Sequence, residues 1–167
     1  MRSLFSRWFS RSVTTPKAAA TDSLDYDQWI HFDAEELAET GIAKAYRKLL
    51  PALATYVASP AELTELVDQD LPSYKVQCGG EEYVIWSADE PGTEQDGWAR
   101  ATYFLFHMVN QQLTEADVKF YAIGADNDLG GMFLLPERAE SAQDTIPNKS
   151  YWPYLPELDG PWYGMFH

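Results

Sequence analysis

Two adjacent glycines, Gly79 and Gly80, separate two short runs of strand-forming residues at 74–78 and 83–86. Glycine reaches positive φ at little steric cost, and the tight turns of β-hairpins require positive φ. The two runs are therefore predicted to form a hairpin. No other local pattern constrains the fold as strongly, because a hairpin requires an antiparallel sheet with a buried face.

A second hairpin is predicted further along the chain. Apolar runs at 118–123 and 132–135 flank the stretch 124–131, which contains three glycines. Between the two hairpins, residues 98–113 repeat their apolar side chains at helical spacing and show no period-two alternation. A helix is expected there.

The residues before the first hairpin carry helix signals. Asp33 followed by Glu36 is a capping-box pattern, and the apolar residues behind it recur at helical spacing. Pro51 lacks an N–H, so we predict a break there and two helices, at 34–50 and 52–58.

A further helix is predicted after Pro60, because proline is favoured at the first helical position. The residues Leu63, Leu66 and Val67 are spaced so that they would face the core of such a helix. Four acidic residues would then form one outer edge that could contact a partner: Glu62, Glu65, Asp68 and Asp70.

Helices followed by hairpins predict an α+β fold, with an antiparallel sheet of about four strands built from the two hairpins and helices on one face. The final stretch, 136–167, holds five prolines, so we expect it to be an irregular Pro- and aromatic-rich segment. The length of 167 residues suits one domain. We expect residues 25–167 to form that domain and residues 1–24 to be a separate segment and linker.

The formal charge of −14 is unevenly distributed along the chain. Residues 1–20 contain four basic residues and no acid, so all 26 acidic residues lie in the remainder, beside only eight basic ones. A body this acidic repels nucleic-acid phosphates and attracts basic proteins over long range. We therefore expect a basic protein partner and no nucleic acid, with solubility as the alternative explanation of the acidity.

The basic N-terminal segment has an amphipathic pattern on a helical wheel. Two interpretations are open: a helix that lies on a membrane surface or docks on a partner through residues 1–12, or an unstructured terminus. In a eukaryote the same composition would suit a mitochondrial presequence. The apolar arc and the basic residues of this candidate helix are Leu4, Phe5, Trp8, Phe9, Arg7 and Arg11.

No segment carries a recognised catalytic or cofactor-binding motif, so we predict no enzyme activity, no cofactor and no metal site. Asp126, Asp128 and Glu137 match the spacing of an EF-hand loop. Gly130 supplies no side-chain oxygen where that loop needs a ligand, so no calcium site is expected. The single cysteine, Cys78, favours a reducing, cytoplasmic compartment. No run of about 18 apolar residues is present, so no membrane-spanning helix is expected.

The end of the chain is the segment richest in aromatic residues. Trp and Tyr held by nearby prolines make good anchors for a protein partner, and the alternative is a lid over an open flank of the core. The loop at 88–97 adds acidic residues to the candidate contact surface. Besides the acidic helix edge, the candidate contact residues are Glu90, Glu94, Trp152, Trp162 and Tyr163.

Several features occur together: small size, an acidic body, helices ahead of short hairpins, the tip at 126–131 leading into 132–135, and a Pro- and aromatic-rich end. In these features the chain resembles the small acidic immunity proteins of bacterial toxin–immunity pairs. The resemblance implies a protein that neutralises a toxin or effector by stoichiometric binding, with acidic residues steering association and aromatic residues covering the partner's active site. The alternatives are a membrane-surface adaptor that uses the N-terminal helix and a small enzyme of unrecognised type.

Overall fold

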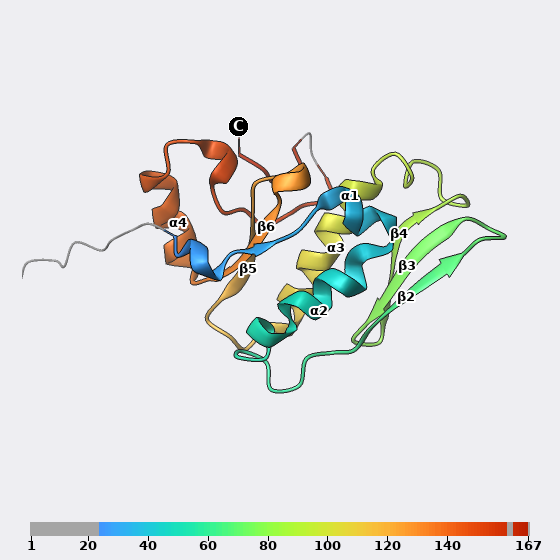
Figure 1. Ribbon diagram of the computed structural model, residues 1–167, viewed down its shortest axis with the longest axis horizontal. Coiled ribbons are helices and arrows are strands. Elements are labelled where there is room, and N and C mark those ends of the chain that lie inside the picture. The colour runs from blue at the N-terminus through green and yellow to red at the C-terminus, as the bar shows by residue number, and fades with distance from the viewer. Residues whose placement is uncertain (1–23, 160–161, 167) are drawn as a thin grey trace, which may run out of the picture.

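The computed structural model describes residues 24–159 and 162–166, so the candidate helix around Trp8 lies outside the described residues. The described chain has an α+β fold, as predicted, but its strands form two three-stranded antiparallel sheets (Figure 1). The prediction of one sheet of about four strands is wrong, because each hairpin recruits its own third strand. The elements are β1 (Ile30–His31), α1 (Ala34–Glu36), α2 (Ile42–Leu53), β2 (Leu63–Asp68), β3 (Ser73–Cys78), β4 (Glu81–Ser87), α3 (Gly97–Gln112), β5 (Lys119–Ile123), β6 (Gly130–Leu134) and α4 (Pro136–Thr145).

The first sheet, which we call the outer sheet, has the strand order β2-β3-β4. Its β3–β4 hairpin confirms the first predicted hairpin, and Gly79 and Gly80 adopt φ values of 61° and 88° in the turn. The helix predicted after Pro60 is wrong, because these residues form β2. This strand pairs with β3 without a register shift, from Leu63 opposite Cys78 to Asp68 opposite Ser73.

The second sheet, which we call the inner sheet, has the order β1-β6-β5. The β5–β6 hairpin confirms the second predicted hairpin, but its last two glycines lie in the strand rather than in the turn. Ile30 pairs with Gly131, and a Cβ atom at Gly131 would overlap the rings of Phe120 and Phe32. The missing side chain is therefore what lets two aromatic rings pack over β6.

Helices α1, α2 and α3 lie between the two sheets, not on one face of a single sheet as predicted (Figure 1). Helix α3, which confirms the helix predicted at 98–113, contacts β4 on one side and β5 on the other. Helix α4 packs on the far face of the inner sheet, where Ala139 and Ala142 join Tyr121 and Met132 in a second apolar cluster. Both faces of the inner sheet are therefore covered.

The predicted helix break is placed differently in the structure. Pro51 was expected to break a helix, but it lies in the last turn of α2, which continues through it because Leu49 and Leu53 are buried in the core. The real break comes earlier, within the wide turn Leu37–Gly41, where Thr40 has a φ of 76°. Asp33 caps α1 as predicted, accepting hydrogen bonds from the N–H groups of Glu35 and Glu36.

The segment 136–167, predicted to be irregular throughout, begins with the ten-residue helix α4. Pro136 stands at the start of this helix, where its fixed φ suits the helix and its missing N–H costs nothing. Its role is that of a helix start rather than a helix breaker. Within the described ranges, no helix is long and apolar enough to cross a membrane.

Candidate functional site

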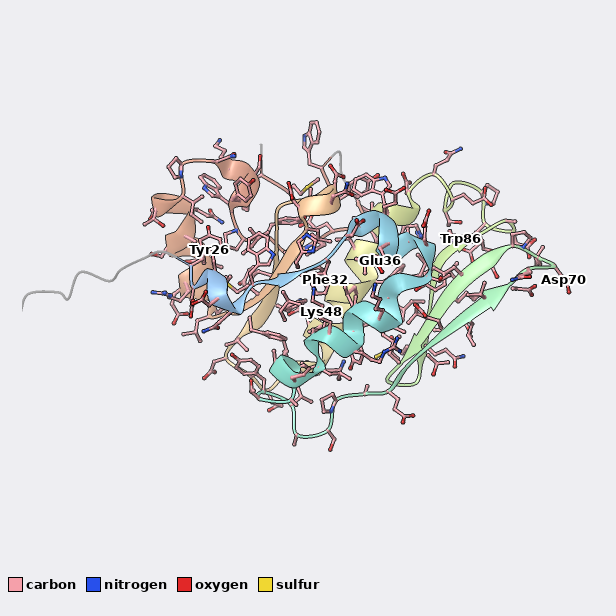
Figure 2. All side chains as sticks on the ribbon, in the orientation of Figure 1. Tyr26, Phe32, Glu36, Lys48, Asp70 and Trp86 are labelled. Atoms are coloured by element: carbon pink, nitrogen blue, oxygen red, sulfur yellow. The ribbon has the colours of Figure 1, made fainter. Side chains whose placement is uncertain are left out.

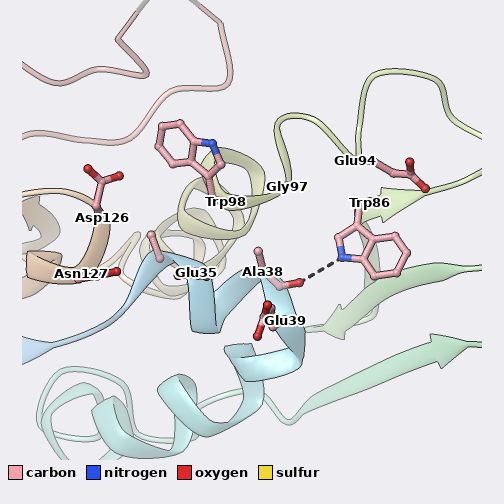
Figure 3. Close-up of a pocket in the computed structure, with 10 residues that line it drawn as sticks. Glu35, Ala38, Glu39, Trp86, Glu94, Gly97, Trp98, Asp126 and Asn127 are labelled. Atoms are coloured by element: carbon pink, nitrogen blue, oxygen red, sulfur yellow. Dashed lines mark hydrogen bonds between the residues drawn. The ribbon is translucent and has the colours of Figure 1, made fainter.

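A cavity of about 630 Å³ opens where α1 and the turn after it meet the end of β4, the start of α3 and the turn Asp126–Asp128 (Figure 3). Segments that are far apart in the sequence thus build one surface. We call this cavity the Trp98 groove, and the residues that give it its chemistry are Glu35, Glu39, Trp86, Glu94, Trp98 and Asp126.

Two indole rings give the groove its apolar surface. Trp86 is held in place because its Nε1 donates to the carbonyl of Ala38 at 3.1 Å, the bond drawn in Figure 3. Trp98 is 38% exposed, although its position on α3 would suit a core residue. The ring of Tyr163 packs edge-on against it with 5.3 Å between centroids, and the Tyr163 hydroxyl donates to Asp96 at 3.2 Å. Both indoles are therefore positioned by the fold.

Four exposed carboxylates stand around these rings: Glu35, Glu39, Glu94 and Asp126. Among the described residues, no basic side chain lines the groove. Within the described part of the chain, the side chains of these four residues take part in no hydrogen bond or ion pair; the two ion pairs found there join Lys44 to Glu36 and Lys75 to Glu82. The groove therefore carries negative charge that the described fold does not neutralise.

The carboxylates are spread around the groove rather than gathered on one point. Across residues 24–159 and 162–166, no three His, Cys, Asp or Glu side chains are grouped so as to hold a metal ion. Asp126 and Asp128, considered above for calcium, lie in a short 3₁₀ turn, and Glu137 lies in α4. Spread charges suit an extended cationic ligand better than a single ion.

A second cavity, of about 450 Å³, lies beyond Trp98 and Asp126, which line both cavities. We call it the aromatic cavity, because half of the described residues that line it are aromatic: Trp98, Tyr154, Trp162, Tyr163 and Phe166. A void of about 20 Å³ is lined by residues of both cavities and by Thr102. Thr102 is only 7% exposed, and its hydroxyl has no hydrogen-bond partner among the described residues.

Backbone strain is concentrated around these two cavities. Three described residues other than glycine have positive φ: Thr40 at 76°, Asp126 at 52° and Tyr163 at 49°. Asp126 lines both cavities, Tyr163 lines the aromatic cavity, and Thr40 directly follows Glu39 of the groove. Such conformations cost about 1–3 kcal/mol each and cluster at functional sites, which favours this region over the rest of the surface.

The structure separates the acidic residues that the sequence placed on one helix edge. Glu65 faces inward from β2, where its carboxylate accepts hydrogen bonds from the Ala43 N–H at 2.9 Å and the Tyr74 hydroxyl at 2.5 Å. Asp68 accepts hydrogen bonds from two backbone N–H groups in the turn that follows β2. Figure 2 shows Asp70 at the far tip of that hairpin, and Glu62 is exposed just before β2. These four residues therefore share no single surface.

Some of the other predicted contact residues line the two cavities, and the others lie elsewhere in the structure. Glu94 lines the Trp98 groove, and Tyr163 and Trp162 line the aromatic cavity. Glu90 is exposed in the loop between β4 and α3. Trp152 is half-buried: its Nε1 donates to the Ile146 carbonyl at 2.7 Å, and its ring packs against Phe166. Trp152 is therefore held within the fold by its own contacts.

The residues Trp86, Trp98, Glu35, Glu39 and Asp126 were not among the predicted site residues. One signal in the sequence could have pointed to them: two tryptophans flank the acidic loop 88–97, an arrangement that places indoles beside carboxylates. No local pattern shows that α1 and the Asp126 turn fold onto the same loop.

The described histidines and Cys78 are engaged with the fold. Burial raises the pKa of the Cys78 thiol, whereas a nucleophilic cysteine needs a lowered pKa. The His107 ring lies between the Tyr103 hydroxyl, at 3.4 Å, and the Gln111 amide nitrogen, at 3.1 Å. His31 contacts the Asn127 carbonyl at 2.9 Å. None of these contacts pairs a nucleophile with a base.

Comparison with known proteins adds no further constraint on function. No protein-family model, curated protein or solved structure matches this chain.

Proposed function

We propose that this protein binds a basic segment of another protein through the Trp98 groove and neutralises that partner stoichiometrically, as a cytoplasmic immunity-type inhibitor. The observation that carries the proposal is the groove itself, in which four carboxylates without partners in the described fold and two positioned indoles surround one cavity of about 630 Å³.

The groove has the chemistry that recognises lysine and arginine side chains. A cation over an indole face contributes about 0.5–2 kcal/mol, and the effect is largest where water is excluded. Arginine suits the groove better than lysine, because its planar guanidinium can stack on an indole while donating to a carboxylate. Because the four carboxylates are spread around the groove, a segment with several lysine or arginine side chains would pair with them best.

The charge of the whole molecule supports a protein partner. At −14, the chain attracts a basic protein from a distance, and association then depends on salt concentration. A partner with a protruding basic segment beside its active site is the kind of protein that this groove would bind. Holding that segment would block the partner, which is the mode of inhibition that the proposal requires.

The proposal is tested by purifying the tagged protein from its native host and identifying bound proteins by mass spectrometry. A double charge reversal, Glu35→Lys with Glu94→Lys, should weaken capture of the partner about 100-fold or more, because like charges across an interface cost several kcal/mol. The matched control, Glu137→Lys with Glu140→Lys, makes the same charge change on α4, away from the groove, and should retain the partner.

Neutralisation is tested separately by co-expressing the captured partner with each variant. The wild type and the α4 control should restore growth or block the partner's activity, and the groove variant should not. Equal capture by both variants would show that the groove is not the binding site. Conversion of a small molecule by the isolated protein would favour the enzyme alternative instead.

A further inference from the structure

We propose that residues 2–11 of the same chain occupy the Trp98 groove and the aromatic cavity, so that a partner must displace this segment to bind. The inference shares its surface with the proposed function. Its test contains no partner, so the two proposals can fail separately.

The two cavities together would suit a ligand that is basic at one end and aromatic at the other. The Trp98 groove supplies four carboxylates, half of the described residues that line the aromatic cavity are aromatic, and Trp98 borders both. Residues 2–11 combine these chemistries: Arg7 is followed directly by Trp8 and Phe9. An arginine on the acidic side of Trp98 would place the next aromatic residues at the aromatic cavity, since successive residues of an extended segment are about 3.3 Å apart.

The charges are complementary as well. Residues 1–20 carry four basic residues and no acid, and the described lining of the groove has four carboxylates and no base. The described fold leaves these carboxylates without partners.

The connecting chain is long enough to reach the site. Leu24, the first described residue, packs against the inner sheet, and His31, seven residues later, contacts Asn127 at the groove. Seven residues span at most about 25 Å, whereas the twelve residues at 12–23 can extend to about 40 Å. The connecting residues can therefore reach the groove at Asn127 without disturbing β1.

A second, independent feature points to a ligand at this place. The Thr102 hydroxyl is buried without a partner and lines the void of about 20 Å³ that adjoins both cavities. Buried hydroxyls are nearly always hydrogen-bonded in folded proteins. A segment seated along Trp98 would close this void from outside, and it could enclose a water molecule that bridges to the hydroxyl.

Tethering makes even a weak contact effective. A segment joined by a short linker experiences an effective concentration in the millimolar range, so an intrinsic affinity in that range already occupies the site for much of the time. A partner whose concentration exceeds its own dissociation constant by a larger factor would displace the segment.

The test uses the full chain with a photo-crosslinking phenylalanine analogue in place of Phe9, illuminated at low protein concentration. Mass spectrometry should find intramolecular adducts in the peptides that contain Trp98 and residues 162–166. The same analogue in place of Thr15, in the linker, is the matched control and should give at least tenfold fewer of these adducts.

Charge variants then test the acidic end of the site. Arg7→Glu, which lies outside the described fold, should reduce the adduct yield at least tenfold, and adding Glu35→Lys should restore part of it. Glu137→Lys with Glu140→Lys should leave the yield unchanged. Adducts scattered over the surface, adducts formed only between two chains, or a yield insensitive to Arg7→Glu would overturn the inference.

Discussion

Thr102 is the one buried side chain in the described ranges whose polar atom has no hydrogen-bond partner. A threonine hydroxyl within a helix ordinarily bonds to the carbonyl of the preceding turn, but this one faces a void instead. Burying a hydroxyl without a partner costs about 1–3 kcal/mol in mutational data. The position therefore weakens the free protein at the point where the two cavities meet.

The Thr102→Val variant should be more stable than the wild type by about 1 kcal/mol, because valine has the same shape and no unpaired hydroxyl. Chemical denaturation at equilibrium measures the difference. Thr102→Ser, which keeps the hydroxyl and loses the methyl group, is the control and should be less stable than the wild type. A loss of stability in the valine variant would show that a bound water molecule satisfies the hydroxyl.

At the scale of elements, the N-terminus of α2 is capped by the outer sheet. Its N-cap residue, Gly41, has no side chain to offer, so two other groups satisfy the first N–H groups of the helix. The Tyr74 hydroxyl accepts from the Ile42 N–H at 3.2 Å and donates to Glu65, which also accepts from the Ala43 N–H. Burial, with the Glu65 hydrogen bond as a second cause, raises the pKa of Tyr74. This network joins β2 and β3 to α2.

Replacing Glu65 with alanine should lower the free energy of unfolding by about 1–3 kcal/mol, because it leaves a buried hydroxyl and a helix N–H without their acceptor. Glu62→Ala removes the same charge from an exposed position just before β2 and should change stability by no more than about 0.5 kcal/mol. A double-mutant cycle with Tyr74→Phe should give a coupling energy of about 0.5–3 kcal/mol. Equal effects of Glu65→Ala and Glu62→Ala would contradict this account of the cap.

The same contact explains why β2 was mistaken for a helix. On a strand, Leu63, Glu65 and Val67 point to one side, so the inward-facing position in the middle holds an acid where an apolar residue is expected. That substitution hides the period-two pattern and leaves only the helical spacing of Leu63, Leu66 and Val67. The need for Glu65 comes from Ala43 and Tyr74, which are its neighbours only in the folded protein.

Elements whose sequence pattern is set by neighbouring residues could be predicted. The hairpin at Gly79 and Gly80, helix α3 and the Asp33 cap each depend on residues close together in sequence, and all three are confirmed. The Trp98 groove depends on contacts between distant segments. Its carboxylates come from before and after α3, so only Glu94 could be selected from the sequence, as part of an acidic loop.

At the scale of the whole molecule, buried and half-buried tyrosine hydroxyls should make the fold sensitive to alkali. Burial is the main cause that raises the pKa of Tyr83 to about 12, and the Glu81 hydrogen bond adds to it. The pKa values of Tyr46, Tyr74 and Tyr154 are raised as well, again mainly by burial. The unfolded chain releases these protons near pH 10, whereas the folded chain holds them to higher pH.

Stability should therefore be fully present below pH 10 and should fall as the pH rises through about 12, because the unfolded state then binds fewer protons than the folded state. Each retained proton contributes a slope of about 1.4 kcal/mol per pH unit. Urea denaturation at pH 9 to 12 measures the fall. Tyr83→Phe should make it shallower, and Tyr26→Phe, at an exposed tyrosine, should not. A flat profile would contradict the argument.

The pairing of Ile30 with Gly131 has a consequence for the order in which the molecule assembles. The strands of the outer sheet are neighbours in sequence, so they can pair as soon as they leave the ribosome. Strand β1 must wait until β6 has been synthesised, and bringing their distant ends together carries a large loop-closure entropy. We expect β1 to join last. Substitutions in it should then speed unfolding more than they slow folding.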